Sequence, residues 1–141
     1  MANPQWVAIT IYPSNFDVII KELDLFTGKF FKDETGKDTE ISSSVIEGVK
    51  IPAGKSYTIY SSGKNDLKDG TAGSFELYGE NSERIGMYSW ECLWRSLRNV
   101  SMWKSGVEEP LKRKYTTELS GGDMTSVSLG IVSLQVTKIR H

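Results

Sequence analysis

Polar and apolar residues of this chain alternate in short runs with a period of two. In the first run, residues 6–12, aromatic and small side chains on one side alternate with β-branched side chains on the other. This alternation is typical of a half-buried β-strand. A second run, residues 16–25, follows the Pro-Ser-Asn segment at 13–15. That short connection predicts that the first two strands form an antiparallel hairpin.

The same pattern returns along the rest of the chain. The later predicted strands cover residues 56–61, 71–78, 85–94, 112–119 and 127–136. The last of them changes phase midway, which predicts a β-bulge. Thirteen glycines punctuate these runs, and helical periodicity never extends over ten residues. Many short strands separated by turns predict an all-β fold, a β-sandwich of antiparallel strands that forms a single domain over residues 1–141.

The charge balance limits what this domain can bind by electrostatic attraction. Seventeen Lys and Arg residues face eighteen Asp and Glu residues, so the net charge is -1. Nucleic-acid binding depends on neutralised phosphates and therefore on a basic surface, so we expect no nucleic-acid partner. The same balance argues against anionic headgroups as the main attraction to a membrane. The short basic run at residues 112–114 is interpreted as a solvated strand edge.

The inventory of reactive side chains is unsuited to most kinds of catalysis. His141 is the only histidine and the last residue, and Cys92 is the only cysteine. Catalytic triads need a positioned imidazole, and zinc sites need several His or Cys ligands. The acidic segment 33–40 lacks the ligand spacing of a calcium loop. A pair of carboxylates from distant strands is the one arrangement left open. We therefore expect that the protein is not an enzyme and that it binds no metal ion or cofactor.

Neither a membrane span nor a secretory leader is recognisable. No apolar run approaches the roughly 20 residues of a spanning helix. Residues 1–5 carry no basic segment followed by an apolar one, which a signal peptide requires. We therefore expect a protein made in the cytoplasm, or released by an unconventional route, that acts at the membrane of a target cell.

An aromatic cluster between residues 88 and 103 has two interpretations. Three of the four tryptophans lie there, within fourteen residues. On a strand, Tyr88, Trp90, Cys92 and Trp94 share one face. These rings could fill the core, where tryptophan is usually buried. Tryptophan and tyrosine also favour the interface between membrane and water, so a loop-borne cluster inserted between lipid headgroups is the functional interpretation.

With this segment in view, the sequence resembles the aegerolysin family of fungal and bacterial proteins. The matching segments run along most of the chain: residues 5–7, 28–29, 37–38, 62–66, 69–77 and 90–94, the last resembling the family's Trp-Asp-Cys-Pro-Trp. The resemblance implies a β-sandwich that recognises membrane lipids, often sphingolipids or sterol-rich membranes. It also implies the docking component of a two-part cytolysin, with a perforin-class protein or, in bacterial insecticidal members, a different protein as partner.

Candidate lipid-binding residues follow from the aromatic cluster and from the resemblance taken together. They are Trp6, Phe26, Lys64, Asp69, Tyr88, Trp90, Glu91, Trp94 and Trp103. Trp90 and Trp94 match family tryptophans near the membrane-facing end, and Asp69 falls where some members have an acidic residue in the lipid site. Phe26 lies in a segment where many members have a tryptophan at the next position, and Leu93 replaces the family proline. These departures leave the headgroup open.

The sequence therefore predicts a membrane-lipid-binding component of a binary pore-forming toxin, with an insecticidal role inferred from the bacterial members. It would dock on the target membrane and recruit a second, pore-forming protein. A carbohydrate- or receptor-binding module without pore formation is the alternative. A homo-oligomeric structural or signalling protein without membrane action is a third hypothesis. Self-association before docking also stays open.

Overall fold

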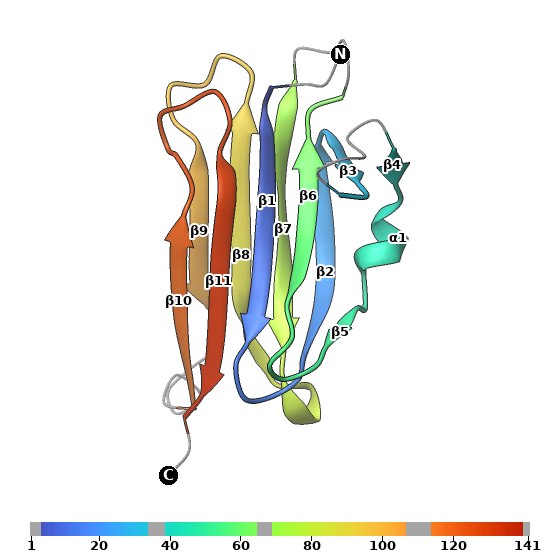
Figure 1. The fold of residues 1–141 in the computed structure, drawn as a ribbon, viewed down its shortest axis with the longest axis vertical. Helices are drawn as coiled ribbons and strands as arrows, with labels where there is room; N and C mark the ends of the chain where they lie inside the picture. Colours follow the sequence, from blue (N-terminus) through green and yellow to red (C-terminus); the bar gives the residue numbers. More distant parts are fainter. Residues whose placement is uncertain (1–3, 34–38, 65–68, 107–113, 140–141) are drawn as a thin grey trace.

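Two β-sheets pack face to face in the computed structural model, which describes residues 4–33, 39–64, 69–106 and 114–139 (Figure 1). The six-stranded sheet has the order β10 (Tyr115–Gly121), β11 (Gly130–Lys138), β1 (Trp6–Pro13), β6 (Tyr57–Ser62), β3 (Lys29–Phe31) and β4 (Glu40–Ile41). The five-stranded sheet has the order β5 (Lys50–Ile51), β2 (Val18–Thr27), β7 (Gly70–Tyr78), β8 (Arg84–Leu93) and β9 (Val100–Ser105). A helical turn, α1 (Ser43–Ile46), and a 3-10 turn, η1 (Glu80–Ser82), complete the described elements.

The core lies between the sheets and is made by alternate residues of the long strands. Val7, Ile9 and Ile11 of β1 are fully buried, as are Val132 and Leu134 of β11. The predicted all-β sandwich is confirmed. Its described strand pairs are antiparallel except for β1 and β11, which run parallel. Across the described residues, no helix is long and apolar enough to cross a membrane.

The predicted hairpin between the first two strands is wrong. Strand β1 pairs with β6 and β11, whereas β2 pairs with β5 and β7 in the other sheet. The connection between β1 and β2 is therefore an arch that passes from one sheet to the other. Its residues form hydrogen bonds with the end of β11. The Asn15 side-chain amide donates to the Lys138 carbonyl at 2.8 Å, and Phe16 is buried against the Tyr115 ring, with 5.1 Å between centroids.

The predicted bulge in the last strand is also wrong. Strand β11 begins only at Gly130, and its pairing with β1 and β10 continues without a register shift. The phase change between Leu129 and Val132, both buried, falls at the strand start. Gly130 has φ +81 there, a left-handed conformation that glycine adopts without a steric cost. A turn therefore produces the pattern that resembled a bulge.

Gly28 joins the two sheets at one end of the sandwich. It has φ +96, and a Cβ atom at this position would lie 2.5 Å from the Ser62 carbonyl oxygen and 2.8 Å from that of Gly70. Ser62 ends β6 in one sheet, and Gly70 begins β7 in the other. Only a residue without a side chain allows this close approach. The turn at Gly28 thus fixes the position of the residues that precede it.

Candidate functional site

Strand register brings most of the predicted residues to one end of the sandwich, the upper end in Figure 1. Trp6 pairs with Ser62, Thr27 with Ala72, and Gly70 with Leu93. These paired positions bring their sequence neighbours to the same end: Phe26, Lys64, Asp69 and Trp94. Glu91 lies two residues before the end of β8. We name this surface the loop end. It comprises residues 26–29, 62–64, 69–70, 94–99 and 122–129.

Tyr88 and Trp90 are not part of the loop-end surface, because both are fully buried in the core. Their rings stack on each other with 6.3 Å between centroids. The Trp90 indole N–H donates to the Thr71 hydroxyl at 3.0 Å, and Thr71 shares a 2.6 Å hydrogen bond with Ser61 of the opposite sheet. The polar atom that would favour a membrane interface is therefore satisfied inside the protein, and the core interpretation holds for these two residues.

The buried Tyr88 hydroxyl leads to a prediction for alkaline pH. Burial raises the pKa of Tyr88 to about 12, partly offset by the 2.8 Å hydrogen bond with Ser101. The unfolded side chain titrates near 10, so this stabilisation is complete below pH 10 and is lost as the pH rises through about 12. We expect the unfolding free energy of Tyr88→Phe to fall less steeply over this range, as measured by urea denaturation.

Burial also raises the pKa of Tyr57 and of Cys92, so the Tyr88→Phe protein should keep a residual slope. An alkaline slope identical to that of the wild type would mean that folding does not hold the Tyr88 hydroxyl protonated above pH 10, and would contradict this prediction.

Trp103 is also removed from the loop end. It lies on β9 opposite Tyr88, in the middle of the strand, and packs half-buried against the core. Gly86 makes room for its ring, since a Cβ atom there would lie 2.4 Å from Trp103 Cζ2. Trp103 therefore closes the edge of the core between the sheets.

Two exposed aromatic side chains remain at the loop end, with Asp69 between them. The exposed fraction is 70% for Phe26 and 37% for Trp94. The Thr27 hydroxyl, next to Phe26, donates to Asp69 Oδ2 at 3.2 Å, and the Trp94 backbone N–H donates to the Asp69 carbonyl at 3.3 Å. Asp69 Oδ1 is buried, and among the described residues no donor reaches it. This carboxylate oxygen can accept a hydrogen bond from a bound cationic group.

Lys64 and Glu91 are exposed near the same end. Residues 65–68, which follow Lys64 in the segment of family resemblance, lie outside the described residues. Glu91 lies opposite Ala72 and Val100 on the outer face of the five-stranded sheet.

Trp6 occupies a separate groove on the outer face of the six-stranded sheet. The groove has a volume of about 310 Å³ and is lined by Trp6, Ala8, Thr10, Phe31, Thr58, Tyr60 and Ile131. Ala8 pairs with Tyr60 on one side and with Ile131 on the other, so a small residue lies between two larger ones. Among the described residues, no charged side chain lines the groove, and the Thr10 and Thr58 hydroxyls are 2.9 Å apart.

Sequence reasoning missed two exposed apolar residues of the loop end. Leu97 has an exposed fraction of 92% and Val127 one of 59%. Leu97 is an isolated apolar residue in a polar loop, so no periodicity marks it, whereas Val127 fits the alternating pattern of the predicted strand 127–136 and lies before the start of β11. Metal ligands are a separate matter: within the described ranges, no three His, Cys, Asp or Glu side chains come together in a way that could hold an ion.

Comparison with known proteins finds matches over nearly the whole chain. The aegerolysin family model matches residues 4–139. Asp-hemolysin of Aspergillus fumigatus is 36% identical, over 99% of this chain and 96% of its own length, and ostreolysin A6 of Pleurotus ostreatus is 31% identical over 98% of both.

Solved structures show the same similarity. IP-1A from Alcaligenes faecalis has a TM-score of 0.86 at 34% identity, covering 99% of this chain and 94% of its own. RahU protein, solved in complex with TRIS, has a TM-score of 0.88 at 29% identity, covering 99% of both chains. This chain belongs to the aegerolysin family.

Proposed function

We propose that this protein docks on lipid membranes through its loop end and serves as the recognition component of a cytolytic toxin. The observation that carries the proposal is that two exposed aromatic side chains, Phe26 and Trp94, lie in segments that are hydrogen-bonded to Asp69. Exposed aromatic rings partition into the membrane interface, and a carboxylate oxygen that no donor among the described residues reaches suits a cationic group. Ethanolamine headgroups supply a cation with N–H donors, whereas choline headgroups supply the positive charge alone.

The cytolytic part of the proposal rests on the family and on its named members. Asp-hemolysin, a relative over nearly the whole chain, is named for haemolysis. We propose that this chain supplies lipid recognition, in sphingolipid- or sterol-rich membranes, and that a second protein forms the pore. An insect target is proposed from the resemblance to bacterial members of the family.

Vesicle flotation tests the lipid-docking proposal. We expect the protein to float with vesicles containing sphingomyelin or ceramide phosphoethanolamine, with or without sterol, and to stay behind with plain phosphatidylcholine. Asp69→Asn should weaken binding about tenfold, because the ammonium group loses its charged acceptor. Glu118→Gln, which removes one exposed carboxylate from β10, is the matched control and should bind normally. A wild-type protein that floats with none of these mixtures would refute lipid docking.

A carbohydrate-binding function is the second candidate, and the Trp6 groove favours it. Its lining combines aromatic and aliphatic walls with two threonine hydroxyls and carries no charge. Small-molecule sites are typically concave and mostly apolar, with a few well-placed polar groups. A glycan array would decide the matter: glycan binding that is lost in Trp6→Ala, together with indifference to every vesicle, would favour this function over lipid docking.

A further inference from the structure

Two loops of the loop end are held together as one unit, visible side by side at the upper left of Figure 1. The first connects β8 to β9 through residues 94–99, and the second connects β10 to β11 through residues 122–129. Asn99 links them. Its backbone N–H donates to the Met124 carbonyl at 2.7 Å, and its side-chain amide donates to the carbonyls of Asp123 and Ser126 at 2.7 and 2.8 Å. We name this unit the paired loops.

The second loop has its own internal support. The Asp123 carboxylate accepts hydrogen bonds from the backbone N–H groups of Thr125 and Ser126, both at 3.0 Å. The hydrogen bond from the Thr125 backbone is the main cause that lowers the pKa of Asp123, and the bond from Ser126 adds to it. The negative charge of Asp123 is therefore already stabilised by hydrogen bonds within the turn. The buried Cys92 thiol donates to the Val127 carbonyl at 3.2 Å. The paired loops are therefore formed before any partner arrives.

The tips of these preformed loops carry apolar side chains in water. Leu97 is the most exposed large apolar residue among those described, and Val127 presents more than half of its surface. Exposed single apolar residues are common, but here two lie on adjacent loops beside the exposed Trp94. Burial of apolar area in the outer part of a bilayer is favourable in proportion to that area.

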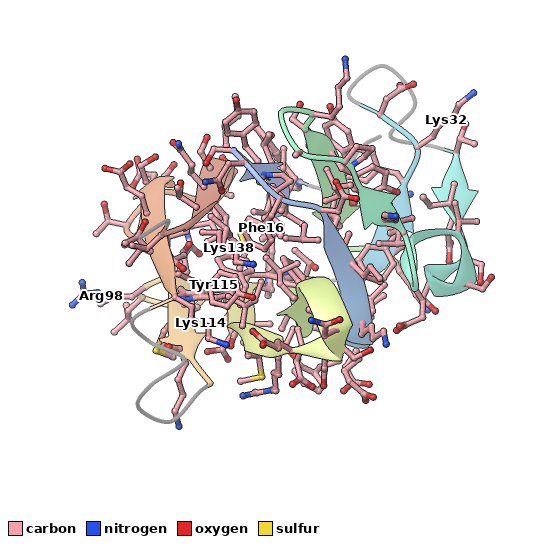
Figure 2. The ribbon with its side chains drawn as sticks, turned by 90° about the horizontal axis from the view of Figure 1, so that it is seen from below. Phe16, Lys32, Arg98, Lys114, Tyr115 and Lys138 are labelled. Atoms are coloured by element: carbon pink, nitrogen blue, oxygen red, sulfur yellow. The ribbon has the colours of Figure 1, made fainter. Side chains whose placement is uncertain are left out.

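Two arginines flank the most exposed of these side chains. Arg95 and Arg98 stand on either side of Leu97 and are both exposed. Among the described residues, neither guanidinium group forms an ion pair or a hydrogen bond, and Figure 2 shows Arg98 extending away from the sheets. Guanidinium groups bind phosphate and carboxylate oxygens in a planar, two-pronged geometry. An apolar tip between two such groups suits a membrane surface that carries negative charge.

We infer that the paired loops form a second lipid contact that prefers anionic lipids. Leu97 and Val127 enter the boundary between headgroups and acyl chains, while Arg95 and Arg98 bind the negative groups around them. The inference rests on the proposed docking function and adds a charge requirement to it. The net charge of -1 does not oppose it, because the attraction is local and acts within about a Debye length. Glu91, the acidic residue nearest to the two arginines in sequence, lies on the outer face of the five-stranded sheet.

The test compares vesicles of fixed sphingolipid and sterol content with and without phosphatidylserine. At low salt, phosphatidylserine should strengthen wild-type binding about tenfold or more, since each of two arginines contributes at the surface. The gain is the ratio of the two affinities of one protein, and R95Q/R98Q should lose this gain, so that it binds both kinds of vesicle with equal affinity. The control K55Q/K104Q removes two exposed positive charges from other parts of the surface and should keep the gain. Leu97→Ser should bind more weakly to both kinds of vesicle.

The two arms separate this inference from the proposed function. Binding without phosphatidylserine reports on sphingolipid docking, and the increment reports on the paired loops. A wild-type protein that gains nothing from phosphatidylserine overturns the inference, and so does a control that loses the gain as fully as R95Q/R98Q. Arginine-dependent binding to phosphatidylserine in a protein that ignores sphingolipid and sterol would support the inference while refuting the docking proposal.

Discussion

Replacing Trp90 by alanine should lower the unfolding free energy by about 3–5 kcal/mol, the range for large aromatic residues removed from a core. Trp90 is fully buried, and its ring packs near those of Phe30, Phe75 and Tyr88. Truncation would leave a large cavity and would deprive the Thr71 hydroxyl of a donor. Urea denaturation followed by circular dichroism measures the effect.

A second variant separates the hydrogen bonds of Thr71 from the ring packing. Thr71→Val keeps the side-chain volume but leaves the Trp90 indole N–H without its acceptor and removes the hydrogen bond with Ser61, which together should cost about 1–3 kcal/mol. It should cost less than Trp90→Ala, because the ring contacts remain. A Trp90→Ala protein of wild-type stability that no longer binds vesicles would reverse this assignment and make Trp90 a lipid contact.

The double variant Phe26→Ser, Trp94→Ser should lose most of its vesicle binding and remain folded. An aromatic ring that enters the interface contributes roughly 1–2 kcal/mol through its buried apolar area, so removal of both should weaken partitioning about thirtyfold to nearly a thousandfold. Phe26 is 70% exposed in the free protein but Trp94 only 37%, so the unfolding free energy should fall by roughly 1–2 kcal/mol, mostly through Trp94, and by less than for the fully buried Trp90. Flotation and urea denaturation on the same preparations provide both values.

The matched control is Tyr12→Ser, Val45→Ser. These two residues are exposed to 37% and 57% and lie away from the loop end, on β1 and α1. The control should bind vesicles like the wild type. Equal losses in the two double variants would mean that general surface hydrophobicity, and not the loop end, drives binding.

The fate of the aromatic cluster illustrates what a period of two can predict. It places Tyr88, Trp90 and Trp94 on one face, and the first two do share the buried face of β8. The strand ends at Leu93, however, and Arg95 adopts φ +60 directly afterwards. Trp94 therefore leaves the core because of where the strand ends. Strand ends depend on local turns and tertiary contacts, which periodicity does not record.

Pairing between distant strands is harder to predict than the strands themselves. The Pro-Ser-Asn segment at 13–15 does reverse the chain. Residues of these types, however, can form an arch between two sheets as readily as a hairpin within one sheet. Contacts with Val136 and Lys138, more than 120 residues away, decide the matter. The parallel pairing of β1 with β11 depends on the same long-range contacts.

The candidate site could be predicted only in part for a related reason. Asp69, Thr27 and Trp94 come from three separate segments, and the hydrogen bonds between them arise only when both sheets close around Gly28. Family resemblance alone points to Asp69, whereas Trp94 is indicated both by the resemblance and by the aromatic cluster. Leu97 and Arg98 have neither periodicity nor resemblance to mark them.

Quenching of tryptophan fluorescence by brominated lipids tests the central claim most directly, because a ring is quenched only on close contact with the lipid. Vesicles of the composition that binds best would carry bromine on the upper part of the acyl chains, and the wild type would be compared with Trp94→Phe. Trp90 and Trp103 lie in and against the core and Trp6 lines the groove on the outer face of the six-stranded sheet, so all three should be quenched much less than Trp94. We expect clear quenching of the wild type that largely disappears in Trp94→Phe. Quenching of equal strength in both proteins would contradict docking through the loop end.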